Sequence, residues 1–393
     1  MQILTLTDLK ALAMRGETVN TSAHVQIDKV ATKTTKEGKP YREIHCIDSR
    51  EKVILKAWSD SPVYSACESL ASGLCVEISG EFGHHAAFGL EARRWSFRLL
   101  SAGEQAALFA GPGALREKQE TDYGFILEMH ESLRDPRLRY LWELFLAEYG
   151  DRFRRSAAAR SFHHARRGGL VEHVAGMMRA ANAVAGVYPQ LNRDLLLSGT
   201  LFHDCGKLWE NHVAETGFSI EHNEMGELLG HINMGIEVVN KLWNKMRVCD
   251  PYSGWKELLP TCESVRLHLL HLIASHHGEM EFGSPVLPKT PEAITLHYID
   301  NLDAKLEMMF GGYQTAPQVA PNIHDRVRPL KQYLITPLSA FVEAALAAGV
   351  VATELPQQGA CSIEKAPAKS AASAAMRFSE AEPFLAEELP LRG

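Results

Sequence analysis

A histidine and an aspartate stand side by side at the end of an apolar segment, in the stretch LFHDCGKLWE at 201–210. Two ionisable side chains in apolar surroundings cost free energy unless a partner compensates for them. Imidazole and carboxylate groups are common metal ligands, so His203 and Asp204 suggest a metal site. Short motifs recur by chance, however, and the pair alone leaves a structural role open.

Further ligand-type residues follow along the chain, each beside an apolar helical stretch. The ordered series is His173, His203, Asp204, His231, His276, His277 and Asp300. Helix bundles often carry metal sites in their cores, where ligands from several helices converge. Nitrogen and oxygen ligands favour Mn, Fe, Co, Zn or Mg over thiolate-loving metals. Seven ligands exceed the needs of one ion, so two divalent ions could share one carboxylate, an arrangement that promotes phosphoester hydrolysis.

Each residue of the series also has a structural alternative when it is taken alone. A single histidine on an apolar helix, such as His173 or His231, is more often a hydrogen-bonded core residue. His276 and His277 could cap a helix end, and Asp300 could form a salt bridge. The complete ordered set is far more specific than any of its members.

Helices must position these ligands, because apolar residues from Ser101 onward recur at three- and four-residue spacing. Asn192 can cap a helix that begins at Arg193, and Thr290 followed by Pro291 is typical of another helix start. Residues from about Gly16 to Leu100 alternate instead, which favours four short strands and a short helix at 61–72. That order is compatible with a small Greek-key barrel of the OB type.

We therefore predict a multidomain chain. Its expected parts are a nucleic-acid-binding β-barrel of the OB type (1–100), a helical linker (101–150), an all-α phosphohydrolase domain (151–350) and a disordered tail rich in Ala, Pro, Ser and Glu (351–393).

Composition narrows the class of protein. The formal net charge of −7 argues against a chain that is basic throughout, although a local basic groove is compatible with it. Seven scattered cysteines without a C-x-x-C pair favour reduced thiols. We read no signal peptide and no membrane helix, and we expect a cytoplasmic protein without a membrane partner.

The order H…HD…H…HH…D resembles the two-metal form of the HD-domain phosphohydrolases. Closer likeness links five segments, 163–173, 191–210, 226–235, 275–293 and 296–309, to the YhaM-type 3′-5′ exoribonucleases, and the segment 30–58 to the OB part of that family. The likeness covers about residues 20–310. One departure is the turn at 48–52, which lacks the glycine usual in that family and puts the turn geometry in doubt.

The resemblance implies that the seven residues of the series form the metal centre, with Asp204 as the bridging carboxylate. We expect Mn as the metal, with Fe, Co, Zn or Mg as alternatives. Lys207 would reach a phosphate or leaving oxygen unless it is a solvated lysine. His163 and His164 are candidates for phosphate contact or proton donation, and we select His164; both could instead lie on the surface. Asp303 could orient ligands or pair with a nearby cation.

Basic residues in two segments predict contacts with nucleic acid. The predicted contact residues are Lys36, Lys39, Tyr41 and Arg42 in the first hairpin, and Arg155, Arg160, Arg166 and Arg167 before the first metal ligand. OB barrels hold single strands by aromatic stacking and a basic groove. The alternative for the second segment is an arginine-rich helix face paired with glutamates. We assign Trp58 to the barrel core.

The expected function is a metal-dependent 3′-5′ exoribonuclease. It would release mononucleotides from single-stranded RNA, with single-stranded DNA as a further candidate substrate, by attack of a metal-activated hydroxide on the terminal phosphodiester. The direction of degradation comes only from the resemblance. The alternatives are a phosphodiesterase for a cyclic dinucleotide or nucleotide, and a binding module with an inactive HD centre. A homo-oligomer is an open option.

Overall fold

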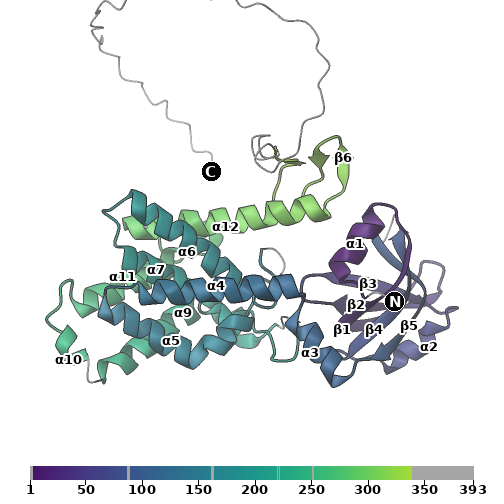
Figure 1. Cartoon of the computed structure of the whole chain (residues 1–393), viewed down its shortest axis with the longest axis horizontal. Helices are drawn as coiled ribbons and strands as arrows, with labels where there is room; N and C mark the ends of the chain where they lie inside the picture. Colours follow the sequence, from purple (N-terminus) through teal and green to yellow (C-terminus); the bar gives the residue numbers. More distant parts are fainter. Residues whose placement is uncertain are drawn as a thin grey trace, which may run out of the picture. The chain divides into compact units, whose positions relative to one another are not determined.

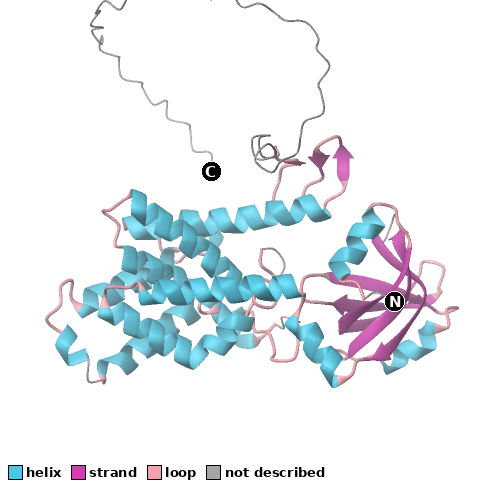
Figure 2. Ribbon diagram, viewed as in Figure 1, coloured by secondary structure: helices cyan, strands magenta, loops and turns pink. Residues whose placement is uncertain are grey.

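The computed structural model describes residues 3–85, 89–160, 163–218, 220, 222–249 and 252–338. The predicted disordered tail at 351–393 lies outside these residues. Strands dominate the first hundred residues and helices the rest of the described chain (Figures 1 and 2). None of the helices in the described part is both long and apolar enough to cross a membrane.

The N-terminal part is a five-stranded antiparallel sheet with short helices. Its strands are β1 (Val19–Thr34), β2 (Pro40–Ile47), β3 (Lys52–Trp58), β4 (Cys75–His85) and β5 (Gly89–Leu99), in the spatial order β3-β2-β1-β4-β5. The helical elements are α1 (Leu6–Met14), α2 (Val63–Ala66) and the 3-10 turn η1 (Cys67–Ser69). One hydrophobic core joins α1 to the sheet. Helix α1 and the fifth strand are additions to the predicted elements.

Strand β5 departs from simple alternation because it contains a bulge. Between the pairs Ser79–Ser96 and Glu81–Arg93, one residue of β4 faces two residues of β5. Before the bulge the buried side chain of β5 is Leu90, at an even-numbered position. After the bulge it is Trp95, at an odd-numbered position. A period-two pattern therefore fails across this strand, since an inserted residue reverses which side chains face the core.

A closed OB barrel is not confirmed. Strands β3 and β5 are the two edges of the sheet, and within the described residues no ladder of backbone hydrogen bonds joins them. The alternation of apolar and polar residues in the sequence predicts where strands lie and which of their faces is buried. Whether the edges meet depends on strand tilt and stagger, which the alternation does not specify.

The turn without the family glycine is held by a buried carboxylate. Oδ1 of Asp48 accepts hydrogen bonds from the backbone N–H groups of Arg50 and Glu51, both at 2.9 Å. Its Oδ2 accepts from the N–H of Leu6 at 2.8 Å. An aspartate that satisfies the backbone in this way stabilises a tight turn without glycine.

The helical part contains all of the predicted ligands. Its helices are α3 (Ala102–Ala110), α4 (Gly113–Glu131), α5 (Pro136–Arg155), α6 (Gly169–Val187), α7 (Arg193–Phe202), α8 (Lys207–Glu210), α9 (Glu224–Arg247), α10 (Tyr252–Trp255), α11 (Cys262–Ser275), the 3-10 turn η2 (Met280–Phe282) and α12 (Pro291–Thr315). A small sheet of β6 (Gln318–Ala320), β7 (Ile323–His324) and β8 (Leu334–Ile335) follows. The expected caps at Asn192 and Thr290 are confirmed, since each side chain accepts a hydrogen bond from the first turn.

A single hydrophobic core runs through the helical part. Ile126 of α4 and Leu141 of α5 lie in the same core as Val174 of α6 and Leu272 of α11. The segment 101–150, which the sequence predicted as a linker, thus supplies helices to the core that supports the ligands.

Helices α8 and α9 approach each other with almost no space at Gly206. A Cβ atom there would lie 1.9 Å from the carbonyl oxygen of His231 and 2.8 Å from the backbone nitrogen of Gly235. Both contacts are with backbone, which cannot rotate away as a side chain can. Glycine at 206 is therefore what lets His203 and His231 share one site.

We predict that Gly206→Ala destabilises the protein. The added methyl group must separate α8 from α9, and overpacking of this kind costs about 1–3 kcal/mol. Urea unfolding should show the loss. Gly186→Ala in α6 is the matched control, because a Cβ at that position meets nothing within 4 Å. The control should be neutral or slightly stabilising, and equal stability of both variants would contradict the proposed close packing.

Candidate metal centre

The seven predicted ligands converge in the helical core. They come from α6 (His173), the end of α7 (His203 and Asp204), α9 (His231), the end of α11 (His276 and His277) and α12 (Asp300). Two compact groups of ligand atoms result, one of His173, His203 and Asp204 and the other of His231, His276 and His277. Asp300 joins the first group, with Oδ1 at 3.4 Å from Nε2 of His173.

Asp204 lies between the two groups. Its Oδ2 is 3.2 Å from Nε2 of His203 and 3.7 Å from Nε2 of His173. Its Oδ1 is 3.5 Å from Nε2 of His231 and 3.7 Å from Nε2 of His276. Each carboxylate oxygen thus faces one group of histidines, which is the arrangement that a shared ligand requires.

Buried polar atoms without partners mark the centre. Nε2 of His173, His203, His231 and His276, together with Oδ1 of Asp204, have no hydrogen-bond partner among the described residues. Unsatisfied buried polar atoms are rare because each one costs free energy. A divalent cation would satisfy all of these lone pairs, so the residues present fit a metal ion.

The opposite nitrogen of each histidine is held by the protein. Nδ1 of His173 donates to Asp303 at 2.7 Å, and Nδ1 of His231 donates to Glu210 at 2.8 Å. The remaining Nδ1 donors bind backbone carbonyls: His203 to Thr200 at 2.9 Å, His276 to Ile273 at 2.8 Å and His277 to Phe282 at 2.6 Å. Such partners fix the tautomer that leaves Nε2 free to bind metal.

Glu210 lies in the candidate site although it is not among the residues predicted from the sequence. Asp204, Lys207 and Glu210 are spaced three residues apart, and Glu210 ends helix α8. This spacing is the sequence pattern that could have indicated Glu210. Burial opposes its charge, but His231 and Lys207 outweigh burial and lower the pKa of Glu210. It therefore carries the negative charge that polarises the imidazole of His231.

Electrostatics keep the carboxylates of the centre ionised. Burial opposes the charge of Asp204, yet Lys207 and the surrounding histidines hold its pKa well below the ordinary value. Burial and the neighbouring His203 and His277 lower the pKa of His276 well below its usual range. Asp204 is thus ionised and His276 neutral, as a metal site needs. Asp300 and Asp303, in contrast, overcome burial and raise the pKa of His173 to about 10, so that metal binding there must displace a proton.

Lys207 belongs to the centre rather than to the solvent. Its Nζ donates to Oδ2 of Asp204 at 2.6 Å, and its side chain is only 12% exposed. Burial works against the charge, but Asp204 and Asp300 overcome this and raise the pKa of Lys207. A permanent positive charge therefore lies directly beside the carboxylate shared by the two groups.

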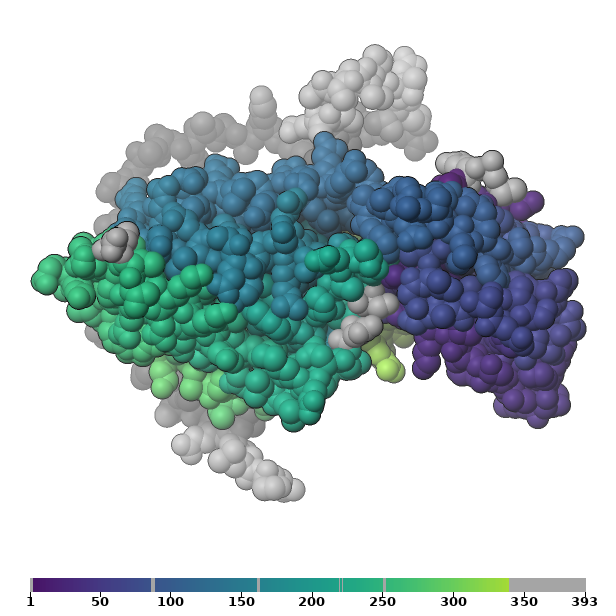
Figure 3. Space-filling model, turned by 90° about the horizontal axis from the view of Figure 1, so that it is seen from below, coloured from purple at the N-terminus to yellow at the C-terminus, as the bar shows by residue number. Residues whose placement is uncertain are grey.

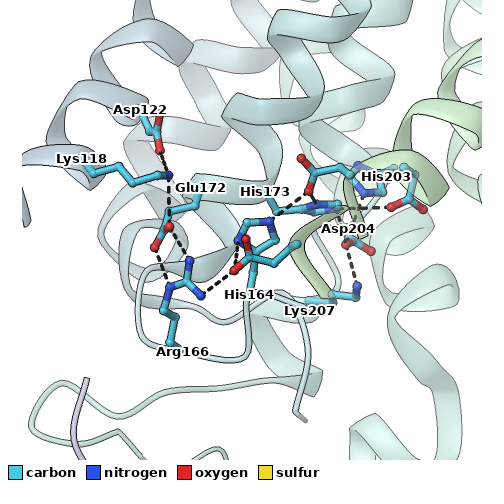
Figure 4. Close-up of polar contacts among 12 residues, drawn as sticks. Lys118, Asp122, His164, Arg166, Glu172, His173, His203, Asp204 and Lys207 are labelled. Atoms are coloured by element: carbon cyan, nitrogen blue, oxygen red, sulfur yellow. Dashed lines mark hydrogen bonds and ion pairs between the residues drawn. The ribbon is translucent and has the colours of Figure 1, made fainter. Parts of the chain in front are cut away.

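The structure places His164 behind the ligands. Its Nε2 donates to Oδ2 of Asp303 at 3.0 Å, the same oxygen that accepts from His173 (Figure 4). His164 is buried and has a positive φ of 47°, which few non-glycine residues adopt. Its contacts support the orientation of Asp303 and not the handling of a substrate proton. The ring centroids of His163 and His164 both lie 5.6 Å from that of His173.

Arg166 is engaged in an ion-pair network next to His173. Its guanidinium donates to both carboxylate oxygens of Glu172, at 3.0 and 2.6 Å, and to Glu307 at 2.8 Å. Lys118 lies 3.1 Å from the same Glu172 (Figure 4). A bidentate pair around a fully buried carboxylate is a structural use of this arginine, because few donors remain for RNA.

The other predicted arginines hold the segment that links α8 to α9. Arg167 donates to the carbonyls of Ala214, Glu215 and Gly217, at 2.6–3.1 Å. Arg160 donates to Glu227 at 2.7 Å, whereas Arg155 makes only a loose pair with Glu215 at 3.9 Å. The tethered segment lies against α3 and α4 (Figure 3), where the ring of Phe218 packs on that of Phe109. Arg167 therefore holds the segment between α8 and α9, and Arg160 fixes the first turn of α9.

The basic residues of the first hairpin are exposed or paired. Lys36 is exposed in the β1–β2 turn, Lys39 pairs with Asp60 at 2.6 Å and Arg42 pairs with Glu68 at 2.7 Å. Tyr41 faces Trp58 across β2 and β3, with ring centroids 5.0 Å apart. Trp58 is half-buried and is not part of the sheet core, so its assignment to the core was wrong.

Comparison with known proteins identifies the family. The HD domain family matches residues 170–305, a range that contains all seven ligands. The chain is 32% identical over 277 residues to the 3′-5′ exoribonuclease YhaM of Bacillus velezensis, covering 69% of this chain and 81% of that protein. The chain belongs to the YhaM family. The YhaM proteins of Bacillus subtilis and Bacillus pumilus are 32% and 31% identical, over 69% and 75% of this chain and 81% and 87% of their own lengths. This YhaM family member keeps Asp303 inside the matched HD range, whereas His163 and His164 precede it.

We predict that Glu210→Gln weakens metal binding. The amide cannot supply the charge that supports His231, and loss of such a partner typically costs about 10–100-fold in metal affinity or activity. Titration of the metal-free protein with Mn, followed by calorimetry, measures this. Glu237→Gln is the matched control, since Glu237 is an exposed residue of α9. Equal affinity of both variants would remove Glu210 from the site.

Proposed function

We propose that this chain is a metal-dependent 3′-5′ exoribonuclease that releases mononucleotides from single-stranded RNA. Membership of the YhaM family supports the activity, and the curated relatives bear the name 3′-5′ exoribonuclease. The observation that carries the proposal is the set of unpartnered Nε2 atoms around Asp204 in the matched HD domain. Single-stranded DNA is a second substrate to be tested.

The proposed cofactor is a pair of divalent ions that share Asp204. His173, His203 and Asp300 would complete one position, and His231, His276 and His277 the other. Mn suits these ligands, with Fe, Co, Zn or Mg as alternatives. When bound, such a pair would activate water at neutral pH and stabilise the attacking and leaving oxygens of the phosphodiester.

The protein's own groups have distinct proposed roles. Lys207 neutralises Asp204 and supplies positive charge where the phosphate becomes more negative in the transition state. Asp303 and Glu210 orient His173 and His231. We assign His164 to the support of Asp303, in place of the direct catalytic role expected from the sequence.

Cellular location is part of the proposal. The described cysteines (46, 67, 75, 205, 249 and 262) are free thiols, which supports a reducing compartment such as the cytoplasm. Cys205 is buried and donates to the carbonyl of Gly235 at 3.7 Å, away from the ligand atoms.

The activity can be tested with end-labelled RNA. Protein incubated with Mn and 5′-labelled single-stranded RNA should shorten the strand progressively from the 3′ end, whereas 3′-labelled RNA should release labelled mononucleotide at once. Release of label from the 5′ end first, or cleavage only of a cyclic dinucleotide, would contradict the proposal.

We predict that Asp204→Asn abolishes turnover. The amide keeps the size of the side chain but removes the charge that two ions would share, so kcat should fall by at least 1000-fold, on the order of a lost catalytic group. RNA binding measured in EDTA should change little. Asn233→Asp, on the exposed side of α9, is a control for a change of charge on a neighbouring helix. Turnover that survives in Asp204→Asn would show that the centre is wrongly placed.

A further inference from the structure

A cavity of about 370 Å³ lies at the open side of the sheet, between its edge strands β3 and β5. Two indole rings line it, Trp58 from β3 and Trp95 from β5. Three cationic side chains, Lys56, Arg93 and Arg94, line it as well, against one carboxylate, Glu91. The cavity exists because the edge strands remain unpaired, and its volume is in the range of small-ligand sites.

The backbone of β5 is strained where it borders the cavity. Arg94 has a positive φ of 48° within the bulge, a conformation that favours glycine. The facing residue is Gly80, where a Cβ would lie 2.7 Å from Cβ of Trp95. The bulge therefore turns Trp95 into the core and Arg94 outward, leaving the Arg94 side chain 87% exposed. Such strain persists at sites where a side chain must point in a particular direction.

Trp58 offers a platform for a flat ring. It is half-buried, opposite Tyr41 in the β2–β3 register, with the ring planes tilted by 38°. Nζ of Lys56 lies 5.7 Å from the centroid of Trp58 and 5.4 Å from that of Tyr41. An aromatic face beside a cation is what single-stranded nucleic acid uses, because bases stack and phosphates pair.

The two arginines of the cavity form exposed ion pairs. Arg94 pairs with Glu81 at 2.6 Å and Arg93 with Glu91 at 2.9 Å, and both arginines are largely exposed. Exposed pairs contribute little free energy, so a phosphate can displace them. Lys56 stands opposite Glu43 in the β2–β3 register, so each cation of the cavity has a carboxylate nearby that a phosphate would have to replace. Exposed arginines beside the aromatic face of Trp58 thus favour an anion that carries a flat ring.

We propose that this cavity binds a nucleotide of single-stranded RNA, with its base stacked on Trp58 and its phosphates held by Lys56, Arg93 and Arg94. The proposal rests on the proposed function, which makes RNA the substrate, and it identifies where the β part holds the strand. It differs from the contacts expected from the sequence, which centred on the first hairpin.

The first test is RNA binding by Trp58→Ala. Binding of a fluorescein-labelled 15-nucleotide RNA to the full chain is followed by anisotropy in EDTA, which prevents metal-dependent turnover. Loss of one stacked base should raise Kd about 10-fold or more. Trp58→Phe keeps an aromatic face and should recover most of the affinity.

The second test, Arg94→Gly, separates binding from folding. Glycine relieves the positive φ, so the melting temperature should stay the same or rise. Kd should nevertheless increase, and the slope of log Kd against log salt should fall by about 0.7, as expected for one lost phosphate contact. Arg50→Gln is the matched control, because Arg50 is exposed in the turn at the opposite end of β3.

The two binding tests together decide whether the cavity binds RNA. Wild-type affinity of both Trp58→Ala and Arg94→Gly would overturn the proposal, and so would an equal loss in Arg50→Gln, which would indicate diffuse electrostatic attraction. An equal loss of single-stranded DNA binding in the Trp58→Ala variant would support a stacking site that accepts either sugar. If the wild type binds RNA through Trp58 but releases no mononucleotide with Mn, the proposed activity fails and the cavity assignment stands.

Discussion

The burial of one carboxylate, Asp204, is the constraint on which the helical part depends. A charged group in an apolar core is tolerated only if other charges and hydrogen-bond donors surround it. Lys207 supplies one such charge, and the converging histidines supply ligand atoms on both sides. The close approach at Gly206 and the loop before His231 can be understood as the means of bringing these groups within reach.

Around Asp204, the side chains that contact it are themselves held by charged groups farther out. The histidines are held by Asp303 and Glu210 at their far nitrogens. Beyond Asp303, Glu172 is surrounded by Arg166 and Lys118, so this buried acid has two cations. A rigid outer layer keeps the lone pairs of the ligands aimed at a common point, which preorganises the site for metal and for a charged transition state.

The β part differs from the helical part in how its charged residues are paired. Among the described residues no ladder joins its edge strands β3 and β5, and a cavity lined with two indoles and three cations lies between them. The helical arginines are largely committed to internal partners, whereas those at the edge of the sheet are paired only weakly. In the function that we propose, the sheet would bind the RNA strand and the helical part would cleave its end.

The sequence by itself singled out the seven candidate ligands, through their residue types, their order and the family resemblance, and the structure brings these seven side chains together. The sequence also determined the caps at Asn192 and Thr290, which depend on contacts within one turn. Only the tertiary structure decided the partners of Glu210 and His164, the open edge of the sheet and the position of Trp58. These features depend on contacts between distant segments, and local patterns do not encode which segments approach or how closely.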